Sequence, residues 1–176
     1  MNAITGFVRR SDISLFYLFN KRLHCALLDL LMKNITHLGS TTFSAALSIF
    51  LVLYPRQEVK STGVSMIIML GLTQFIVQSV KRIVNRPRPY IILRDIIPIN
   101  PPNCKYSFPS GHTCAAFSIA LTLSKSIPGL SMVFVGLALL VALSRVYLGV
   151  HYPTDTVIGS IIAYTSFKIL LIIGII

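Results

Sequence analysis

Five long apolar blocks that carry almost no charge constrain the fold of this 176-residue chain more than any other feature. Each block contains at most one formal charge: 38–54, 62–80, 113–127, 129–143 and 156–176. An α-helix rises about 1.5 Å per residue, so the longer blocks can cross an apolar layer of about 30 Å, and the shorter ones need their flanking residues. Only 12% of the residues are charged, too few for a soluble bundle of this size. The sequence therefore predicts an all-α, integral-membrane helical bundle with about five transmembrane helices.

The N-terminal segment has a different pattern. Over residues 11–35 apolar residues recur at helical spacing, with charged residues between them: Lys21, Arg22, Asp29 and Lys33. This pattern predicts an amphipathic helix that lies at the membrane interface or packs against the bundle, and the two placements are compatible. We interpret the chain as a single membrane domain over 1–176, with an amphipathic segment (1–36) and a transmembrane core (37–176).

Charge and cysteine usage exclude two other classes. The net charge of +11 comes from basic residues in short segments between apolar blocks, where they meet the lipid bilayer or substrate phosphates, and no nucleic-acid-binding motif is found. We therefore predict no nucleic-acid partner. Cys104 and Cys114 flank His112 in the sequence. The side chains of His112 and Cys114 are two residues apart and would diverge on a helix, so we predict no metal site.

Polar residues unusual for a membrane protein are concentrated in two loops, after the second and the fourth apolar block. Because successive spans alternate in direction, these loops lie on one face of the membrane, together with the N-terminal segment. The first loop begins with four cations within eight residues: Lys81, Arg82, Arg86 and Arg88. Basic residues at a span end are common topology anchors. Here, however, the prolines of the Arg-Pro-Arg-Pro run stiffen the chain, and guanidinium groups suit bidentate binding of phosphate.

The same loop ends in Pro109-Ser110-Gly111-His112, which opens the third span. Serine is a good N-cap, glycine permits close backbone approach, and the free amides at a helix start favour an anion. Ordinary capping explains Ser110 but does not explain His112, because an ionisable group in the first turn of a membrane helix is costly.

The second loop carries Ser144 and Arg145 at its start, then His151 and Asp155. Pro153 suits the first turn of the last helix, which places His151 just before that helix and Asp155 within its first turn. A carboxylate there can accept from the imidazole and expose the other ring nitrogen. Taken alone, Asp155 is also explained as an acid favoured by the helix dipole.

Together these residues resemble the signature of the type 2 phosphatidic acid phosphatase superfamily, which also includes vanadium haloperoxidases. The resemblance covers roughly residues 36–176 and rests on three motifs. The first consists of Lys81, Arg88 and Pro89, the second runs from Pro109 to His112, and the third consists of Ser144, Arg145, His151 and Asp155. Any one motif is weak, and the ordered set of three is specific. The haloperoxidases are soluble, so this chain is more similar to the membrane lipid phosphatases.

The resemblance implies that a lipid phosphate or diphosphate is hydrolysed through a phosphohistidine, without metal or cofactor. His151 would be the nucleophile, His112 the general acid and base, and Asp155 would orient His151. Phosphate would be bound by Lys81, Arg88, Arg145, Ser110 and the Gly111 amide, with Pro89, Pro109 and Ser144 in support. Candidate substrates are undecaprenyl diphosphate, phosphatidic acid and phosphatidylglycerol phosphate.

Two alternatives remain open at this point: a phosphotransferase that passes phosphate to another lipid, and a non-enzymatic lipid-phosphate transporter. The resemblance places the active site on the extracytoplasmic face of the cell membrane. The distribution of basic residues outside the motifs favours the cytoplasm mildly, but interfacial helices weaken that count, so we expect the outer face. The sequence does not indicate the oligomeric state.

Overall fold

The computed structural model describes residues 3–94, 96, 98–99, 101 and 104–176. These residues form eight α-helices: α1 (Ala3–Tyr17), α2 (Ala26–Ile35), α3 (Thr41–Leu53), α4 (Gln57–Val84), α5 (Pro89–Ile92), α6 (Gly111–Ser126), α7 (Ser131–Tyr147) and α8 (Pro153–Ile172). Three short helical turns complete them: η1 (Leu18–Arg22), η2 (Thr36–Gly39) and η3 (Pro128–Leu130). Among the described residues there is no strand, only one isolated bridge between Pro87 and Tyr106.

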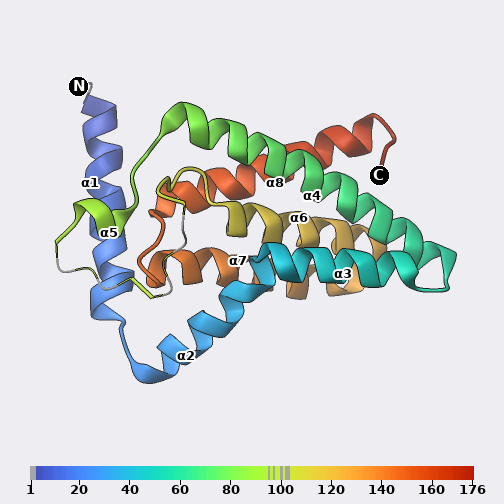
Figure 1. The fold of residues 1–176 in the computed structure, drawn as a ribbon, viewed down its shortest axis with the longest axis horizontal. Coiled ribbons are helices and arrows are strands. Elements are labelled where there is room, and N and C mark those ends of the chain that lie inside the picture. Colours follow the sequence, from blue (N-terminus) through green and yellow to red (C-terminus); the bar gives the residue numbers. More distant parts are fainter. Residues whose placement is uncertain (1–2, 95, 97, 100, 102–103) are drawn as a thin grey trace.

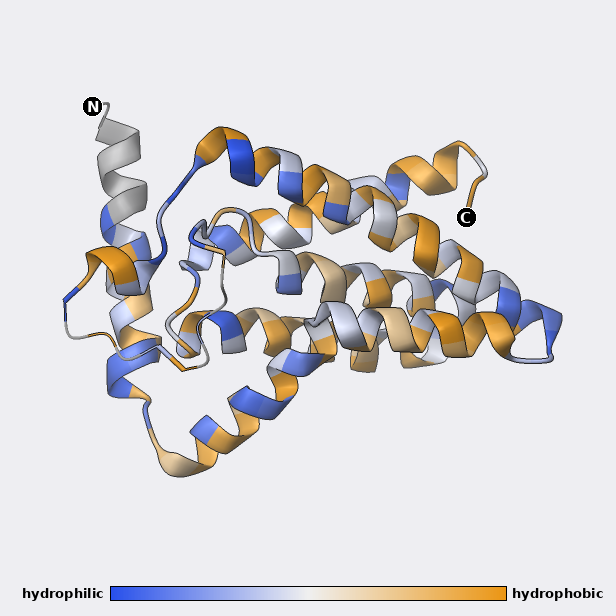
Figure 2. Cartoon of the chain, in the orientation of Figure 1, coloured by the Kyte–Doolittle hydropathy of each residue, from blue (hydrophilic) through white to orange (hydrophobic). Residues whose placement is uncertain are grey.

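The helices α3, α4, α6, α7 and α8 lie side by side along the long axis of the molecule (Figure 1), and each contains most of one apolar block of the sequence. Helix α6 is central, with contacts to α3, α4, α7 and α8. Apolar residues recur along these helices (Figure 2), and many of their side chains are exposed on the outside of the bundle, including Phe75, Met132 and Ile172, which are 72%, 87% and 83% exposed. Such an apolar exterior is unfavourable in water and suits lipid, so the prediction of an all-helical membrane bundle is confirmed.

The number of spans is less directly visible. Among the described residues, three segments are long and apolar enough to cross a membrane: Gln57–Val84, Pro128–Tyr147 and Pro153–Ile172. A fourth is obtained when Ala26–Gly39 and α3, which meet at an angle of 53°, are taken as one bent span. Helix α6 has 16 residues and is shorter than these segments. The structure thus gives three or four candidate spans, and the count of about five stays a prediction.

The predicted N-terminal amphipathic segment consists of two helices. Helix α1 lies across one end of the bundle (Figure 1), and the π-helical turn η1 and a short loop connect it to α2. The ring of Phe16 is fully buried and lies 5.9 Å from the ring of Tyr152, just before α8. Helix α2 has no fully buried residue, but its Leu28 and Met32 pack against the buried cluster at the end of α7. The expected packing against the bundle is therefore found for both helices, and the interfacial placement stays a prediction.

Close packing between α6 and α8 brings the polar loops together. The Ser110 amide donates to the Asp155 carbonyl at 2.9 Å, which joins the starts of the two helices. A β-carbon at Gly159 would lie 2.7 Å from the Ser110 carbonyl oxygen, so only glycine permits this approach. The Ser107 amide donates to the Arg86 carbonyl at 2.8 Å and ties the long loop to the end of α4. All three sequence motifs consequently meet at the end of the bundle that α1 crosses.

Candidate active site

A cavity of about 540 Å³ opens at this end of the bundle, between α3, α4 and the start of α6. Its wall includes six residues of the three sequence motifs: Lys81, Arg88, Gly111, His112, Arg145 and His151. Two imidazoles and three basic side chains from different parts of the chain therefore face one space. The convergence expected from the alternation of spans is present in the structure.

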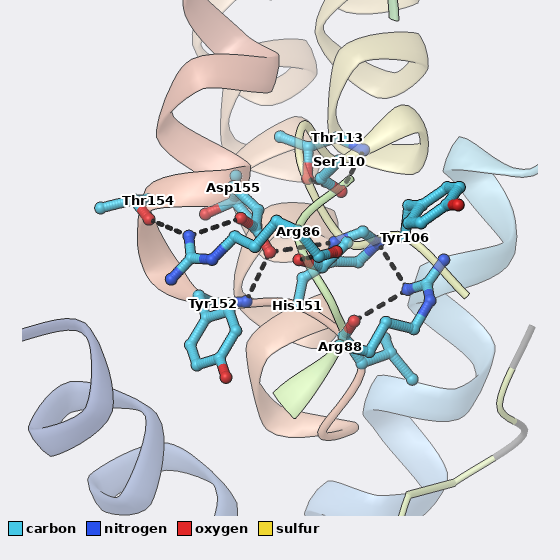
Figure 3. Close-up of polar contacts among 12 residues, drawn as sticks. Arg86, Arg88, Tyr106, Ser110, Thr113, His151, Tyr152, Thr154 and Asp155 are labelled. Carbon is cyan, nitrogen blue, oxygen red and sulfur yellow. Dashed lines mark hydrogen bonds and ion pairs between the residues drawn. The ribbon is translucent and has the colours of Figure 1, made fainter. Parts of the chain in front are cut away.

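His151 lies in the turn between α7 and α8 and is 2% exposed. Its Nε2 is 3.2 Å from Nη1 of Arg88 (Figure 3). Because a guanidinium only donates, Nε2 accepts this bond, and the ring proton is therefore on Nδ1. Nδ1 lies 3.4 Å from Oδ2 of Asp155, an ion-pair distance whose geometry does not qualify as a hydrogen bond. The lone pair of Nε2 thus points toward Arg88, and Asp155 lies on the opposite side of the ring.

Burial is the main reason why the pKa of His151 lies well below its usual value, and the charges of Arg88 and Arg145 act in the same direction. A histidine with a lowered pKa is neutral near pH 7, the form in which Nε2 is a nucleophile. The lowered pKa makes the ring neutral, and the tautomer leaves Nε2 as its unprotonated nitrogen.

The three cations are held by different elements. Lys81 Nζ donates to the Tyr106 carbonyl at 3.4 Å, and Arg88 donates from Nε to the Cys104 carbonyl at 2.6 Å and from Nη1 to the Val150 carbonyl at 2.8 Å. Arg145, at the end of α7, donates from Nη1 to Thr36 Oγ1 at 2.7 Å. Its Nε is buried and has no hydrogen-bond partner among the described residues. A buried donor without a partner is costly, and an anion in the cavity would satisfy it.

Ser110 has a different place from the one expected of a phosphate ligand. Its side chain is fully buried and accepts from the Thr113 amide at 3.4 Å and from Thr113 Oγ1 at 2.9 Å, so it caps α6. It is not among the residues that line the cavity, whereas Gly111 and His112 are. Pro89 begins α5, and Ser144 donates to the Val141 carbonyl at 2.6 Å; both are buried away from the cavity wall. Ser110 therefore caps α6 in this structure, and its role in phosphate binding stays a prediction.

Two residues beside the site were not assigned to it from the sequence. Arg86 donates to Oδ1 of Asp155 at 2.8 Å and to Oδ2 of Asp12 at 2.7 Å. The Arg-Pro-Arg-Pro run did draw attention to Arg86, but as one of several cations. Asp12 lies more than 140 residues before Asp155 in the chain, and no local pattern connects them.

No group of three or more histidine, cysteine, aspartate or glutamate side chains stands close enough to hold a metal ion in the part of the chain that the structure describes. The absence of a metal from the reaction remains a prediction.

The fold and the site together define a helical membrane protein in which three cations and a buried histidine line one cavity. The family model of the PAP2 superfamily matches residues 62–174, which include all three motifs. Two curated relatives are phosphatidylglycerophosphatase B of Bacillus subtilis (34% identical over 146 residues, covering 75% of this chain and 68% of the relative) and undecaprenyl-diphosphatase of Sulfolobus acidocaldarius (28% identical over 164 residues, 90% and 78%).

Solved structures agree with this match. Aquifex aeolicus LpxE superposes with a TM-score of 0.77 at 32% identity, covering 90% of this chain and 93% of that one. A transmembrane PAP2-type phosphatidylglycerolphosphate phosphatase from Bacillus subtilis superposes with a TM-score of 0.78 at 27% identity, covering 95% and 86%. The chain belongs to the PAP2 superfamily, and the family assignment made from the sequence is confirmed.

Proposed function

We propose that this protein is a membrane lipid phosphatase that transfers phosphate to His151 and then to water. The observation that supports this most directly is the convergence of His151, His112 and the three cations on one cavity. The relatives, which are named as phosphatases of lipid phosphates, support the same reaction class. A lipid-phosphate transporter would require the basic residues but not a buried histidine backed by a carboxylate.

The reaction follows from the geometry. Equatorial phosphate oxygens bind Lys81, Arg88 and Arg145, which neutralise the charge that develops on them. Arg88 Nη1 exchanges its hydrogen bond to Nε2 of His151 for one to a phosphate oxygen, which frees the Nε2 lone pair. That lone pair forms a bond to phosphorus, the bond from phosphorus to the lipid oxygen breaks, and His112 gives that oxygen a proton. Water then attacks phosphorus and loses a proton to His112, the phosphorus–nitrogen bond breaks, and inorganic phosphate leaves.

The shape of the cavity favours a substrate with a lipid tail. From the cations the cavity follows the boundary between α3 and α4, with Ile49, Ile67 and Leu70 on its wall. Ile67 precedes Lys81 by 14 residues on α4, which is about 21 Å at about 1.5 Å per residue. An apolar tail can therefore remain between the helices while its phosphate reaches His151.

We expect purified protein in detergent to release phosphate from phosphatidic acid, phosphatidylglycerol phosphate or undecaprenyl diphosphate far faster than from glycerol phosphate. The physical reason is that the tail supplies binding energy that the soluble ester lacks. Phosphate release from this panel, with and without EDTA, measures both the substrate class and the metal requirement. Equal rates with the soluble ester would show that the apolar part of the cavity between α3 and α4 does not contribute to substrate binding. A loss of activity in EDTA that a divalent cation restores would exclude the metal-free mechanism.

We further propose that the active site faces the extracytoplasmic side of the cell membrane. Cys104 is exposed and lies on the cavity wall, whereas Cys114 is buried. A membrane-impermeant maleimide should therefore label Cys104 in intact cells when Cys25 is replaced by serine. As a control, a cysteine introduced at Gly129, in the turn at the other end of the bundle, should react only after the cells are opened. The reverse pattern would place the site in the cytoplasm.

A further inference from the structure

Three charged side chains, Asp12, Arg86 and Asp155, form a continuous row that ends at the imidazole of His151 on the cavity wall. Arg86 Nη2 lies 2.7 Å from Oδ2 of Asp12, and Arg86 Nη1 lies 2.8 Å from Oδ1 of Asp155 (Figure 3 shows Arg86 between Thr154 and Asp155). The other carboxylate oxygen of Asp155, Oδ2, faces Nδ1 of His151 at 3.4 Å. Opposite charges therefore alternate from Asp12 on helix α1 to Asp155, which faces the proposed nucleophile.

The row is rigidly built. Asp12 is 2% exposed, and it accepts from the Thr154 amide at 2.9 Å and from the Thr154 hydroxyl. The guanidinium of Arg86 lies over the ring of Tyr152, 3.9 Å from its centroid, and also donates to Thr154 Oγ1 at 2.8 Å. The Tyr152 amide donates to Oδ2 of Asp155 at 2.9 Å. Each charged group thus has a fixed partner on both sides.

We propose that Asp12 and Arg86 are positioning residues for the reaction, which makes helix α1 a part of the active site. This inference rests on the proposed function. Arg86 occupies Oδ1 of Asp155 and so leaves Oδ2 to face the imidazole. Asp12 shares the same guanidinium, so that Arg86 does not act as a full counter-ion to Asp155. The carboxylate then keeps the negative charge that stabilises the imidazole when it becomes cationic.

The charge balance around His151 gives the row a measurable signature. Five groups face or surround the imidazole: Lys81 on α4, Arg88 before α5, His112 on α6, Arg145 on α7 and Asp155 on α8. Behind them lie Arg86, which follows α4, and Asp12, which is on α1. Removal of the negative charge of Asp12 lowers the pKa of His151 further, because the net positive charge near it increases. Removal of the positive charge of Arg86 raises that pKa. A role confined to folding predicts no such opposite shifts.

The test compares Asp12→Asn, Arg86→Gln and the double variant with a matched charge-removing control, Glu58→Gln, at the first turn of α4 near the other end of the bundle. We measure kcat against pH with a lipid monophosphate in detergent, so that the ionisation of the substrate is common to all variants. Each single variant should lower the maximal kcat on the order of tenfold or more. The acid limb of the profile should move to lower pH in Asp12→Asn and to higher pH in Arg86→Gln, by roughly half a pH unit or more.

In the double variant the acid limb should return toward the wild-type position, and Glu58→Gln should match the wild type. Shifts in the same direction, or unchanged profiles with a wild-type kcat, would overturn the proposal. Asp12→Glu keeps the charge and should retain the wild-type profile even if its thermal stability falls, and a shifted profile in this variant would also contradict the proposal. If the wild-type protein released no phosphate at all, the proposed function would fail instead, so the two failures are distinguishable.

Discussion

Replacement of His151 by alanine is expected to lower kcat by roughly 1,000-fold or more, because it removes the Nε2 atom that lies beside Arg88 and forms the bond to phosphorus in the proposed reaction. Phosphate release from a lipid monophosphate measures the loss. His151→Gln, which keeps a polar group next to Arg88, should be equally inactive. Brief incubation with labelled substrate should leave acid-labile phosphate on the wild-type protein and none on either variant.

The loss must be separated from unfolding, because His151 is buried. We expect both variants to remain folded in detergent, with a cooperative thermal transition that can be compared directly with that of the wild type. His37→Ala is the matched control: His37 is exposed, lies in η2 and is absent from the cavity wall, so its removal should leave turnover unchanged. Appreciable hydrolysis by folded His151→Ala would remove His151 from the nucleophilic role.

Replacement of Arg145 by lysine is expected to lower kcat/KM about 100-fold or more although the formal charge is kept. Arg145 is 4% exposed, Thr36 holds its Nη1, and its buried Nε has no hydrogen-bond partner among the described residues. The flat guanidinium can therefore offer a preoriented donor to phosphate, whereas a lysine ammonium has one nitrogen on a flexible chain. Steady-state kinetics with a lipid monophosphate measure the fall in kcat/KM. Inorganic phosphate should also inhibit the variant more weakly than the wild type.

Two controls accompany this variant. Arg56→Lys makes the same exchange at an exposed position at the other end of the bundle and should leave kcat/KM unchanged. Thr36→Val removes only the group that orients Arg145 and should have a smaller effect, of about tenfold or less. A loss of less than threefold in Arg145→Lys would show that position 145 supplies charge alone and that its planar geometry is unimportant.

Much of the bundle was predictable because membrane helices are specified locally. Each apolar block corresponds to one of the helices α3, α4, α6, α7 and α8, since a backbone in lipid must satisfy its hydrogen bonds within the segment. Pro153 and Ser110 also marked helix starts correctly, because capping and proline act within a single turn. The division of the N-terminal segment into α1 and α2 was not predictable, because its apolar spacing continues through the break.

The proposed site was predictable only in part. The three motifs indicated that His112, His151 and Arg145 would share a face, and the structure places them on one cavity wall. The motifs also suggested Ser110 as a phosphate ligand, whereas its side chain accepts hydrogen bonds within the cap of α6. A one-dimensional motif records which residues occur together, but it does not show which atoms remain free to bind a ligand.

By itself the sequence determined the membrane environment, the helical class, the family and the residues of the three motifs. These properties depend on hydrophobicity and on neighbours within a few turns of the chain. Only the tertiary structure decided that Asp12 and Arg86 stand behind Asp155, that Thr36 holds Arg145, and that the cavity extends between α3 and α4. Those contacts join residues far apart in the chain, and side-chain packing between helices, which no local pattern specifies, brings them together.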